Sequence, residues 1–326
     1  MAKHNVLILS AGRRVELVQQ FKKAAKKYNS DNKVYAADCS ELAPALYIAD
    51  DYFIIPKIHH EDYISELIKI IKSNAIHLIV PTIDTELPVL SKYQKMIEQK
   101  TKAIVMISPS ETIEICNDKI STQEFLEHKG FHVPKLFKNM SHINNNNFPM
   151  FIKPKSGSSS KHTYKIINKA DLDFYFQKIN NPMIQEFVEG TEFTIDVFTD
   201  FQGNPITIVP RKRLEVRNGE ISKGKIIKDQ DIIKHIKKLV DVMKFKGHIT
   251  IQLIKTKQQL IFIEINPRFG GGAPMSIYSG ANSCEYLYKL LNGEHLTYHE
   301  NYVDNLIFLR YDQAVSINQY WSSKND

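Results

Sequence analysis

The stretch from Ile249 to Gly272 reads ITIQLIKTKQQLIFIEINPRFGGG and predicts two strands joined by a polar turn. Side chains alternate between the two faces of a strand, so Glu264 and Asn266 project from one face. With the turn centred near Gln258, Gln252 lies opposite Glu264 on that same face. The apolar neighbours are expected to point into a core; they are Ile251, Leu253, Ile263 and Ile265.

Three oxygen-bearing side chains on one strand face suit a hard cation. Mg2+ takes oxygen ligands in proteins, usually one or two carboxylates plus substrate phosphates, so Gln252, Glu264 and Asn266 are candidate metal ligands. Pro267 ends the second strand, and Arg268 and three glycines follow it. Glycines remove side-chain bulk where a ligand could approach the backbone. The alternative is an amphipathic hairpin with a hydrated outer face.

Composition indicates an ordinary globular protein. The chain has 326 residues, of which 43% are hydrophobic and 24% charged, enough for two or three packed modules. No apolar run is long enough to span a membrane. The three cysteines are scattered and lack CxxC spacing. Reduced thiols fit a cytoplasmic protein, which we therefore expect, without membrane contact.

The chain is basic, with a net charge of +7. Its lysines are spread over many expected helices and match no known nucleic-acid motif. Solvated helix faces and sites for phosphorylated ligands explain the charge at least as well, so we expect no specific nucleic-acid partner. The twelve histidines include no HExxH motif and no cysteine–histidine metal pattern, which disfavours a zinc site.

Strands alternate with amphipathic helices in the first third of the chain. This order predicts an α/β parallel sheet covered on both faces. The expected strands are 6–9, 34–38, 52–55, 75–80 and 103–107. Ligands of such sheets bind beyond the carboxyl ends of the strands. That rule places Arg13, Asp38, Asp84 and Glu86 around one crevice.

The sequence narrows the class of ligand that this crevice could bind. Asp38 ends the second strand, as in nicotinamide-binding proteins, but Gly12 stands alone and GxGxxG is absent. A dinucleotide is therefore disfavoured. Arg13 or Arg14 holding an anionic substrate is the better hypothesis, and a solvent-exposed arginine at a helix start is its alternative.

The middle of the chain carries further motifs. Residues 108–111 show a capping-box pattern that opens a new domain, and a helix over 118–129 stops at Gly130. A strand over 148–154 carries Lys153 into a Ser/Gly loop, which suits phosphate oxygens or is a flexible connector. A strand over 183–188 leads to Glu192, which is placed for ribose hydroxyls or is an exposed acidic turn.

Taken in order, these features resemble the ATP-grasp superfamily. The features on which this resemblance rests are Lys119, the KP strand with its Ser/Gly loop, QEFVEGTEFTID, and Gln252 with EINPR. The nearest likeness is to one ATP-binding unit of the carbamoyl-phosphate-synthetase large subunit, and it covers nearly the whole chain. It implies a Rossmann-like pre-ATP-grasp domain over 1–107, a small lobe over 108–182 and an α+β large lobe over 183–326.

The resemblance also implies roles for individual residues, with ATP and two Mg2+ ions as cofactors. ATP would contact Lys119, Lys153, Ser156, Gly157, Ser158, Ser159 and Ser160 through its phosphates, Gln185, Glu186, Phe187 and Val188 through adenine, and Glu192 through ribose. The metal ligands would be Gln252, Glu264 and Asn266. The catalytic residues would be Arg268, Arg211 and Lys223, and the substrate would meet Arg13, Asp84, Glu86, Arg213 and Arg217.

The chain departs from a full carbamoyl-phosphate synthetase, which has two such units. A single unit favours an ATP-dependent carboxylate–amine ligase that works through an acyl phosphate and releases ADP and phosphate. Small-molecule carboxylates and amines are its expected partners, and a homodimer is an expected assembly. The alternatives are a non-catalytic MgATP-binding regulatory protein, and a carbamoyl-phosphate-synthetase-like phosphorylating enzyme.

Overall fold

A five-stranded parallel sheet forms the first part of the molecule. The computed structural model describes residues 2–155, 162–217 and 219–317. The strand order is β3-β2-β1-β4-β5. These strands are β1 (Asn5–Leu9), β2 (Val34–Asp38), β3 (Asp51–Ile54), β4 (Ile76–Pro81) and β5 (Ile104–Val105). The predicted parallel α/β sheet is confirmed.

Helices cover both faces of this sheet. They are α1 (Val15–Tyr28) on one face, and α2 (Tyr63–Ser73) and α3 (Leu87–Thr101) on the other. Alternate residues of β1 serve the two layers: Val6 and Ile8 pack in the cluster that contains α1, whereas Leu7 and Leu9 pack with α2 and α3. A period of two with apolar residues at every position is what a sheet buried on both faces requires.

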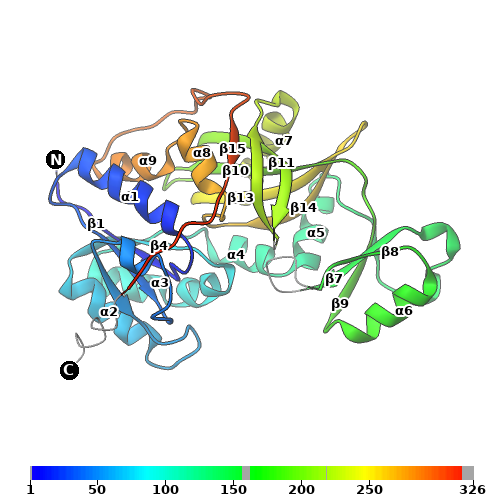
Figure 1. Cartoon of the computed structure of the whole chain (residues 1–326), viewed down its shortest axis with the longest axis horizontal. Coiled ribbons are helices and arrows are strands. Elements are labelled where there is room, and N and C mark those ends of the chain that lie inside the picture. The colour runs from blue at the N-terminus through cyan, green and yellow to red at the C-terminus, as the bar shows by residue number, and fades with distance from the viewer. Residues whose placement is uncertain (1, 156–161, 218, 318–326) are drawn as a thin grey trace.

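A small antiparallel sheet with its own core follows, at the right of Figure 1. Its strands run in the order β6-β9-β7-β8. They are β6 (Leu136–Phe137), β7 (Met150–Pro154), β8 (Tyr164–Ile166) and β9 (Pro182–Glu186), accompanied by α6 (Lys169–Lys178). β9, which the division at residue 182 assigns to the large lobe, completes this sheet, and the division itself stays a prediction.

The largest sheet is antiparallel and contains the hairpin on which the sequence argument began. Its order is β14-β13-β10-β11-β12-β15. The strands are β10 (Thr191–Thr199), β11 (Pro205–Arg217), β12 (Glu220–Ile226), β13 (Gly247–Lys255), β14 (Leu260–Asn266) and β15 (Ile307–Leu309). Its helices are α7 (Gln230–Met243), α8 (Ala273–Tyr278) and α9 (Ser283–Leu291).

The two faces of the large sheet have different coverings. On one face Ile195, Ile249 and Ile251 pack with the apolar stripe of α7. On the other face Phe198 belongs to a cluster that also contains Leu287 of α9 and Phe21 of α1. This second cluster joins the large sheet to the first domain, and it leaves the rest of that face for polar side chains.

Two helices connect the parallel sheet to the small one, α4 (Ser110–Asn117) and α5 (Lys119–His128). The capping box expected at Ser108 is wrong: α4 has no side-chain cap, and the buried Ser108 hydroxyl accepts the Lys246 N–H at 3.1 Å instead. Asp118 caps α5 through the N–H groups of Ile120 and Ser121.

Short 3-10 turns complete the chain at Leu46–Ile48, Asp84–Glu86, Met140–His142 and Asn145–Asn147. The last two lie in the connection between β6 and β7. Within the described ranges, no helix combines the length and the apolar composition needed to cross a membrane.

Candidate functional site

The hairpin of β13 and β14 presents the three candidate metal ligands on one face. Gln252 pairs with Glu264, and Thr250 pairs with Asn266, as the sequence predicts. The expectation for Ile263 is wrong, because the register shifts after Gln252: Leu253 lies opposite Phe262, and Ile263 is the extra, half-buried residue of a bulge. The bulge leaves Glu264 and Asn266 on the open face.

This donor set fits a magnesium ion. The side chains of Gln252, Glu264 and Asn266 make no hydrogen bond or ion pair with any other described residue, so their oxygens are available. One carboxylate and two amide oxygens leave room for phosphate oxygens and water, which Mg2+ usually retains. No group of three or more His, Cys, Asp and Glu side chains suited to a metal occurs in the described part of the chain.

Two lysines from outside the large sheet, Lys153 and Lys119, lie near this hairpin. Lys153, at the end of β7, is 5% exposed. Burial lowers its pKa to about 8, with Glu264 opposing and Lys119 adding to that shift. The N–H of Lys119 also reaches the carbonyl of Lys155 at 3.4 Å. Lys119, Lys153 and Glu264 are therefore brought together. The loop residues Ser156, Gly157, Ser158, Ser159 and Ser160 lie outside the described residues.

The segment expected to read adenine turns its side chains inward. Gln185 donates to Gln123 at 2.5 Å, and the Glu186 carboxylate accepts the Lys135 N–H at 3.0 Å. The Phe187 N–H donates to the Pro149 carbonyl at 3.3 Å. In contrast, the Val188 N–H meets no acceptor among the described residues. Backbone rather than side chains is thus what the hinge can offer a base.

Glu192, the candidate ribose ligand, stands at the mouth of the same face. Its carboxylate lies 3.3 Å from Nε of Arg213, and its side chain is 58% exposed. Burial lowers the pKa of Arg213, while Glu192 raises it, Arg211 lowers it and Glu264 raises it. Arg213 therefore adds a cation close to the candidate metal ligands.

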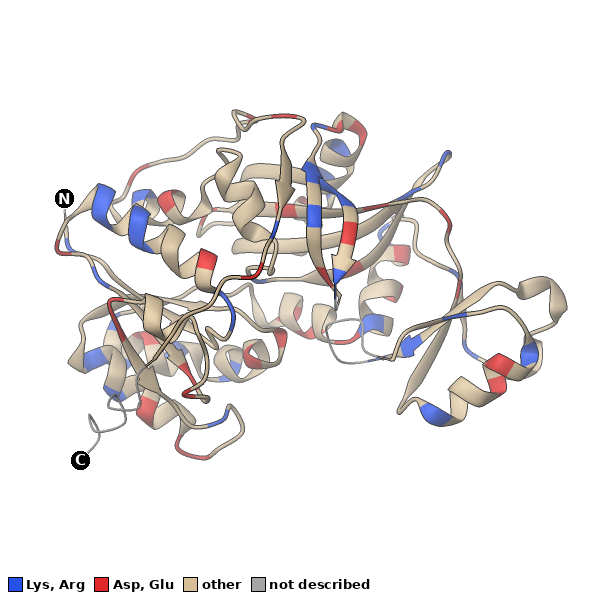
Figure 2. Ribbon diagram, viewed as in Figure 1, with Lys and Arg blue, Asp and Glu red and all other residues tan. Residues whose placement is uncertain are grey.

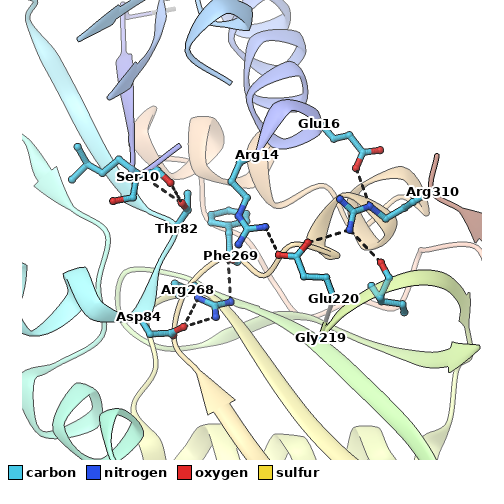
Figure 3. A network of polar contacts seen from close by, with 12 residues as sticks. Ser10, Arg14, Glu16, Thr82, Asp84, Gly219, Glu220, Arg268, Phe269 and Arg310 are labelled. Atoms are coloured by element: carbon cyan, nitrogen blue, oxygen red, sulfur yellow. Dashed lines mark hydrogen bonds and ion pairs between the residues drawn. The ribbon is translucent and has the colours of Figure 1, made fainter. Parts of the chain in front are cut away.

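Arg268 leaves β14 and crosses to the first domain. Its Nε and Nη2 both reach Oδ2 of Asp84, at 3.1 and 2.5 Å (Figure 3). A second bridge runs from Arg14 to Glu220 at 2.8 Å and on to Arg310 at 3.4 Å. The crevice of the parallel sheet thus opens against the loop after β14 and the start of β12.

Of two further expected substrate residues, Glu86 is buried behind the crevice, whereas the role of Arg13 stays a prediction. Glu86 is 1% exposed, and one of its oxygens accepts both the Ser10 hydroxyl at 3.0 Å and the Tyr63 hydroxyl at 2.5 Å. Burial raises the pKa of Glu86 to about 7 against these two hydrogen bonds. Glu86 therefore supports the residues around the crevice through buried hydrogen bonds and does not line the crevice itself. Arg13 is exposed at the start of α1.

Arg211, an expected catalytic residue of β11, lies on the sheet face of the metal ligands, in register with Thr194 and Gln252, but a buried partner holds it. Arg211 is 1% exposed and binds Asp196 through Nε at 2.7 Å, because a buried guanidinium needs a counter-charge. Lys223 of β12 and Arg217 of β11 are exposed to solvent. Lys223 pairs with Glu215, and Arg217 pairs with Asp312. Figure 2 shows acidic residues between the lysines and arginines of these strands.

Asp196 and His248 are buried polar residues that the sequence analysis missed. His248 lies 3.4 Å from Asp196 and stacks on the Phe269 ring at 4.3 Å. Burial opposes ionisation of Asp196, but Arg211 and His248 together hold its pKa far below the usual range. A charged residue inside the apolar run FTIDVF was the available signal.

Two family models match the chain in tandem. Residues 6–106 match the N-terminal domain of PylC-like proteins, and residues 116–272 match the ATP-grasp domain. The first range covers almost all of the parallel sheet, and the second covers the two antiparallel sheets except β15.

Curated relatives with similar sequences are ligases and synthases. The carbamoyl-phosphate synthase of Methanobrevibacter smithii is 24% identical over 271 residues, which are 76% of this chain and 71% of that protein. The D-alanine--D-alanine ligase of Fusobacterium nucleatum is 24% identical over 163 residues, 47% of this chain and 56% of the ligase. A carbamoyl phosphate synthase large chain from Clostridium beijerinckii is matched over 20% of its length. The chain thus spans only part of these relatives.

Solved structures share the fold. An N5-carboxyaminoimidazole synthetase from Staphylococcus aureus, complexed with ADP, has a TM-score of 0.71 at 19% identity, over 94% of this chain and 81% of that one. The biotin carboxylase domain dimer of the Hydrogenobacter thermophilus 2-oxoglutarate carboxylase, with MgADP, has a TM-score of 0.73 at 16% identity, over 94% and 73%. An L-amino acid ligase from Bacillus licheniformis has a TM-score of 0.68 at 16% identity, over 89% and 74%.

Proposed function

Because the chain belongs to the ATP-grasp superfamily, we propose that it is an ATP-dependent ligase that joins a small-molecule carboxylate to an amine through an acyl phosphate. The observation that carries this proposal is that Lys153 of β7 interacts electrostatically with Glu264 of β14 and with Lys119 of α5. Its curated relatives, which are ligases and synthases, support the same class of reaction.

The residues of this face suit the handling of a triphosphate. Lys119 and Lys153 would bind its phosphates, and the Val188 N–H would meet the edge of the base. Gln252, Glu264 and Asn266 would hold Mg2+, which supplies charge neutralisation for phosphoryl transfer when it is bound. Two ions are proposed, as the resemblance implies. The one carboxylate and two amides leave most coordination positions of such ions to phosphate and water.

The proposed chemistry has two steps. A carboxylate oxygen of the first substrate attacks the γ-phosphorus of ATP, and the bond from that phosphorus to the ADP oxygen breaks. The amine nitrogen of the second substrate then attacks the acyl carbon, the bond from that carbon to the phosphate oxygen breaks, and the nitrogen loses its proton to solvent. Anionic charge accumulates in both steps, so cationic side chains such as Lys153 and Arg268 would stabilise them.

The first test is a pairwise screen of amino acids and other small carboxylates and amines for release of ADP and phosphate. We expect release only when both substrates are present, with the amide identified by mass spectrometry. ATP breakdown that ignores every added substrate would count against the ligase. Binding of MgATP without any turnover would support a regulatory nucleotide-binding protein instead.

The second test is Glu264→Ala, which removes the only carboxylate among the candidate metal ligands. We expect turnover to fall by about a hundredfold or more while the protein stays folded, since the carboxylate makes no hydrogen bond or close ion pair with another described residue. Glu111→Gln, on the exposed side of α4, is the matched control and should retain wild-type activity. Full activity of Glu264→Ala would contradict the metal assignment.

A further inference from the structure

A buried charged network lies beside the candidate metal ligands. Its members are Asp196 of β10, Arg211 of β11, His248 of β13 and Ser276 of α8, and each is between 1% and 3% exposed. The register places Asp196 beside Thr250, Arg211 beside Thr194, and Thr194 beside Gln252. The network therefore shares the sheet face of the metal ligands: Arg211 lies in the cross-strand row of Gln252, and Asp196 lies in the row of Asn266.

Asp196 is the centre of this network. Its Oδ2 accepts Nε of Arg211 at 2.7 Å and the Ser276 hydroxyl, and its Oδ1 accepts Nη2 of Arg211 at 3.0 Å. His248 lies 3.4 Å from the same Oδ1, and its other ring nitrogen lies 3.2 Å from the Ser283 hydroxyl. Both carboxylate oxygens are thus occupied by groups from three other elements.

The network also supports the loop that carries Arg268. The His248 ring stacks on the Phe269 ring at 4.3 Å with an interplanar angle of 14°. Arg211 lies against Gly272, where a Cβ would come within 2.7 Å of Nη1, and that Nη1 reaches the Met275 sulfur at 3.9 Å. The network therefore contacts the loop from Arg268 to Gly272 near both of its ends.

We propose that Arg211, acting through Asp196, is a positioning residue that fixes the loop from Arg268 to Gly272 against the metal face. This inference rests on the proposed function, in which the Arg268 guanidinium serves the reaction. Direct contact of Arg211 with a ligand is not compatible with its burial, since its fork already holds Asp196 and its remaining edge faces Gly272.

The planar guanidinium explains why an arginine occupies this position. A bidentate fork fixes the angle between β11 and the carboxylate of β10, and the terminal edge of the same group fits against Gly272, where a Cβ would come within 2.7 Å of Nη1. A lysine would keep the charge but lose both features. Arg211→Lys is therefore the sharpest variant, because it removes the geometry and leaves the charge.

The experiment compares Arg211→Lys with the wild type by hydrogen exchange, MgADP calorimetry and turnover. We expect peptides covering 267–278 to exchange about tenfold faster, with β13 and β14 unchanged. The MgADP Kd should stay within about threefold, because the phosphate and metal ligands are untouched. With the substrates found in the screen, kcat should fall by about a hundredfold with little change in KM for ATP.

Ile236→Val is the matched control, since Ile236 is buried on the opposite face of the same sheet. It should lower the Tm without faster exchange in 267–278. Where Arg211→Lys does not fold, Ser276→Ala removes one donor to Asp196 and should speed exchange in the same peptides to a smaller degree.

Two results would overturn the proposal. One is unchanged exchange of 267–278 in the folded variant. The other is a loss of MgADP affinity in step with kcat, which would show that Arg211 contacts the nucleotide. Failure of the ligase reaction itself is separable, because it would appear in the wild type, whereas exchange and MgADP binding need no turnover.

Discussion

Lys153 is the residue whose environment most directly reports on the candidate nucleotide site. It is almost fully buried, and burial lowers its pKa to about 8, with Glu264 raising and Lys119 lowering it. A bound triphosphate would add several negative charges and raise that pKa again. Protonation of Lys153 is therefore coupled to nucleotide binding.

This coupling predicts a pH dependence of MgATP affinity. Below pH 8 Lys153 is protonated with or without ligand, whereas above pH 8 the free protein must take up a proton to bind. We expect the Kd to rise by about tenfold from pH 7 to pH 9, with net proton uptake measured by calorimetry in buffers of different ionisation enthalpy. Lys153→Arg should abolish this dependence, and a wild-type Kd equal at both values would contradict it.

Glu86 predicts the opposite kind of pH effect, on stability. Burial raises its pKa from 4.5 to about 7, so between these values the folded state keeps a proton that the unfolded chain has lost. Stability therefore falls as pH rises through this window. Glu86→Gln should gain about 2 kcal/mol relative to wild type on going from pH 5 to pH 8, measured by urea unfolding. Glu111→Gln should gain nothing.

At the scale of elements, the glycine run after β14 serves packing. The sequence suggested that Gly270, Gly271 and Gly272 leave room for a ligand, but the protein's own side chains fill that room. A Cβ on Gly271 would come within 2.6 Å of Arg14 and Glu220, and one on Gly272 within 2.7 Å of Arg211 and Ile221. The first pair consists of flexible side-chain ends, whereas Arg211 is buried.

This difference predicts unequal costs for two neighbouring substitutions. Gly271→Ala should cost less than about 1 kcal/mol, because Arg14 and Glu220 can move away, and it should weaken the bridge to the first domain. Gly272→Ala should cost about 2 to 3 kcal/mol, because Arg211 cannot move without breaking its pair with Asp196. Denaturant unfolding of both variants checks the order, and equal costs would contradict it.

At the scale of the whole molecule, the first domain and the large sheet share one apolar core. Val6, Phe21, Phe198 and Leu287 belong to the same cluster, although they come from three parts of the chain. The small sheet instead has a separate cluster around Leu172. The molecule therefore contains one large cooperative unit and one smaller, more independent lobe, which Figure 1 shows standing apart.

We expect Leu287→Ala to loosen both parts of the shared core. It should cost about 2 to 5 kcal/mol and speed hydrogen exchange in β1 as well as in β10, since Leu287 belongs to the cluster that contains residues of both strands. Leu172→Ala, an equally buried leucine of α6, is the control and should affect only the small sheet. Exchange in β1 that stays at the wild-type rate in Leu287→Ala would show that the two parts are independent.

Local patterns determined much of the fold in advance. The alternation of apolar strands with amphipathic helices gave the parallel sheet, and the period of two in the hairpin placed Gln252 opposite Glu264, because these signals depend on neighbours within a few residues. The order of the motifs gave the ATP-grasp domain. The bulge at Ile263 could not be predicted from the sequence, because β14 remains an apolar strand whichever of its residues are assigned to the buried face.

Only the tertiary structure decided the partners of long charged side chains. Arg268 meets Asp84 across 184 residues of sequence, Arg211 is buried on Asp196, and Glu86 turns away from the crevice toward Tyr63. The physical reason is desolvation: a charge taken out of water must find a counter-charge or hydrogen-bond donors, and the folded geometry alone determines which are within reach.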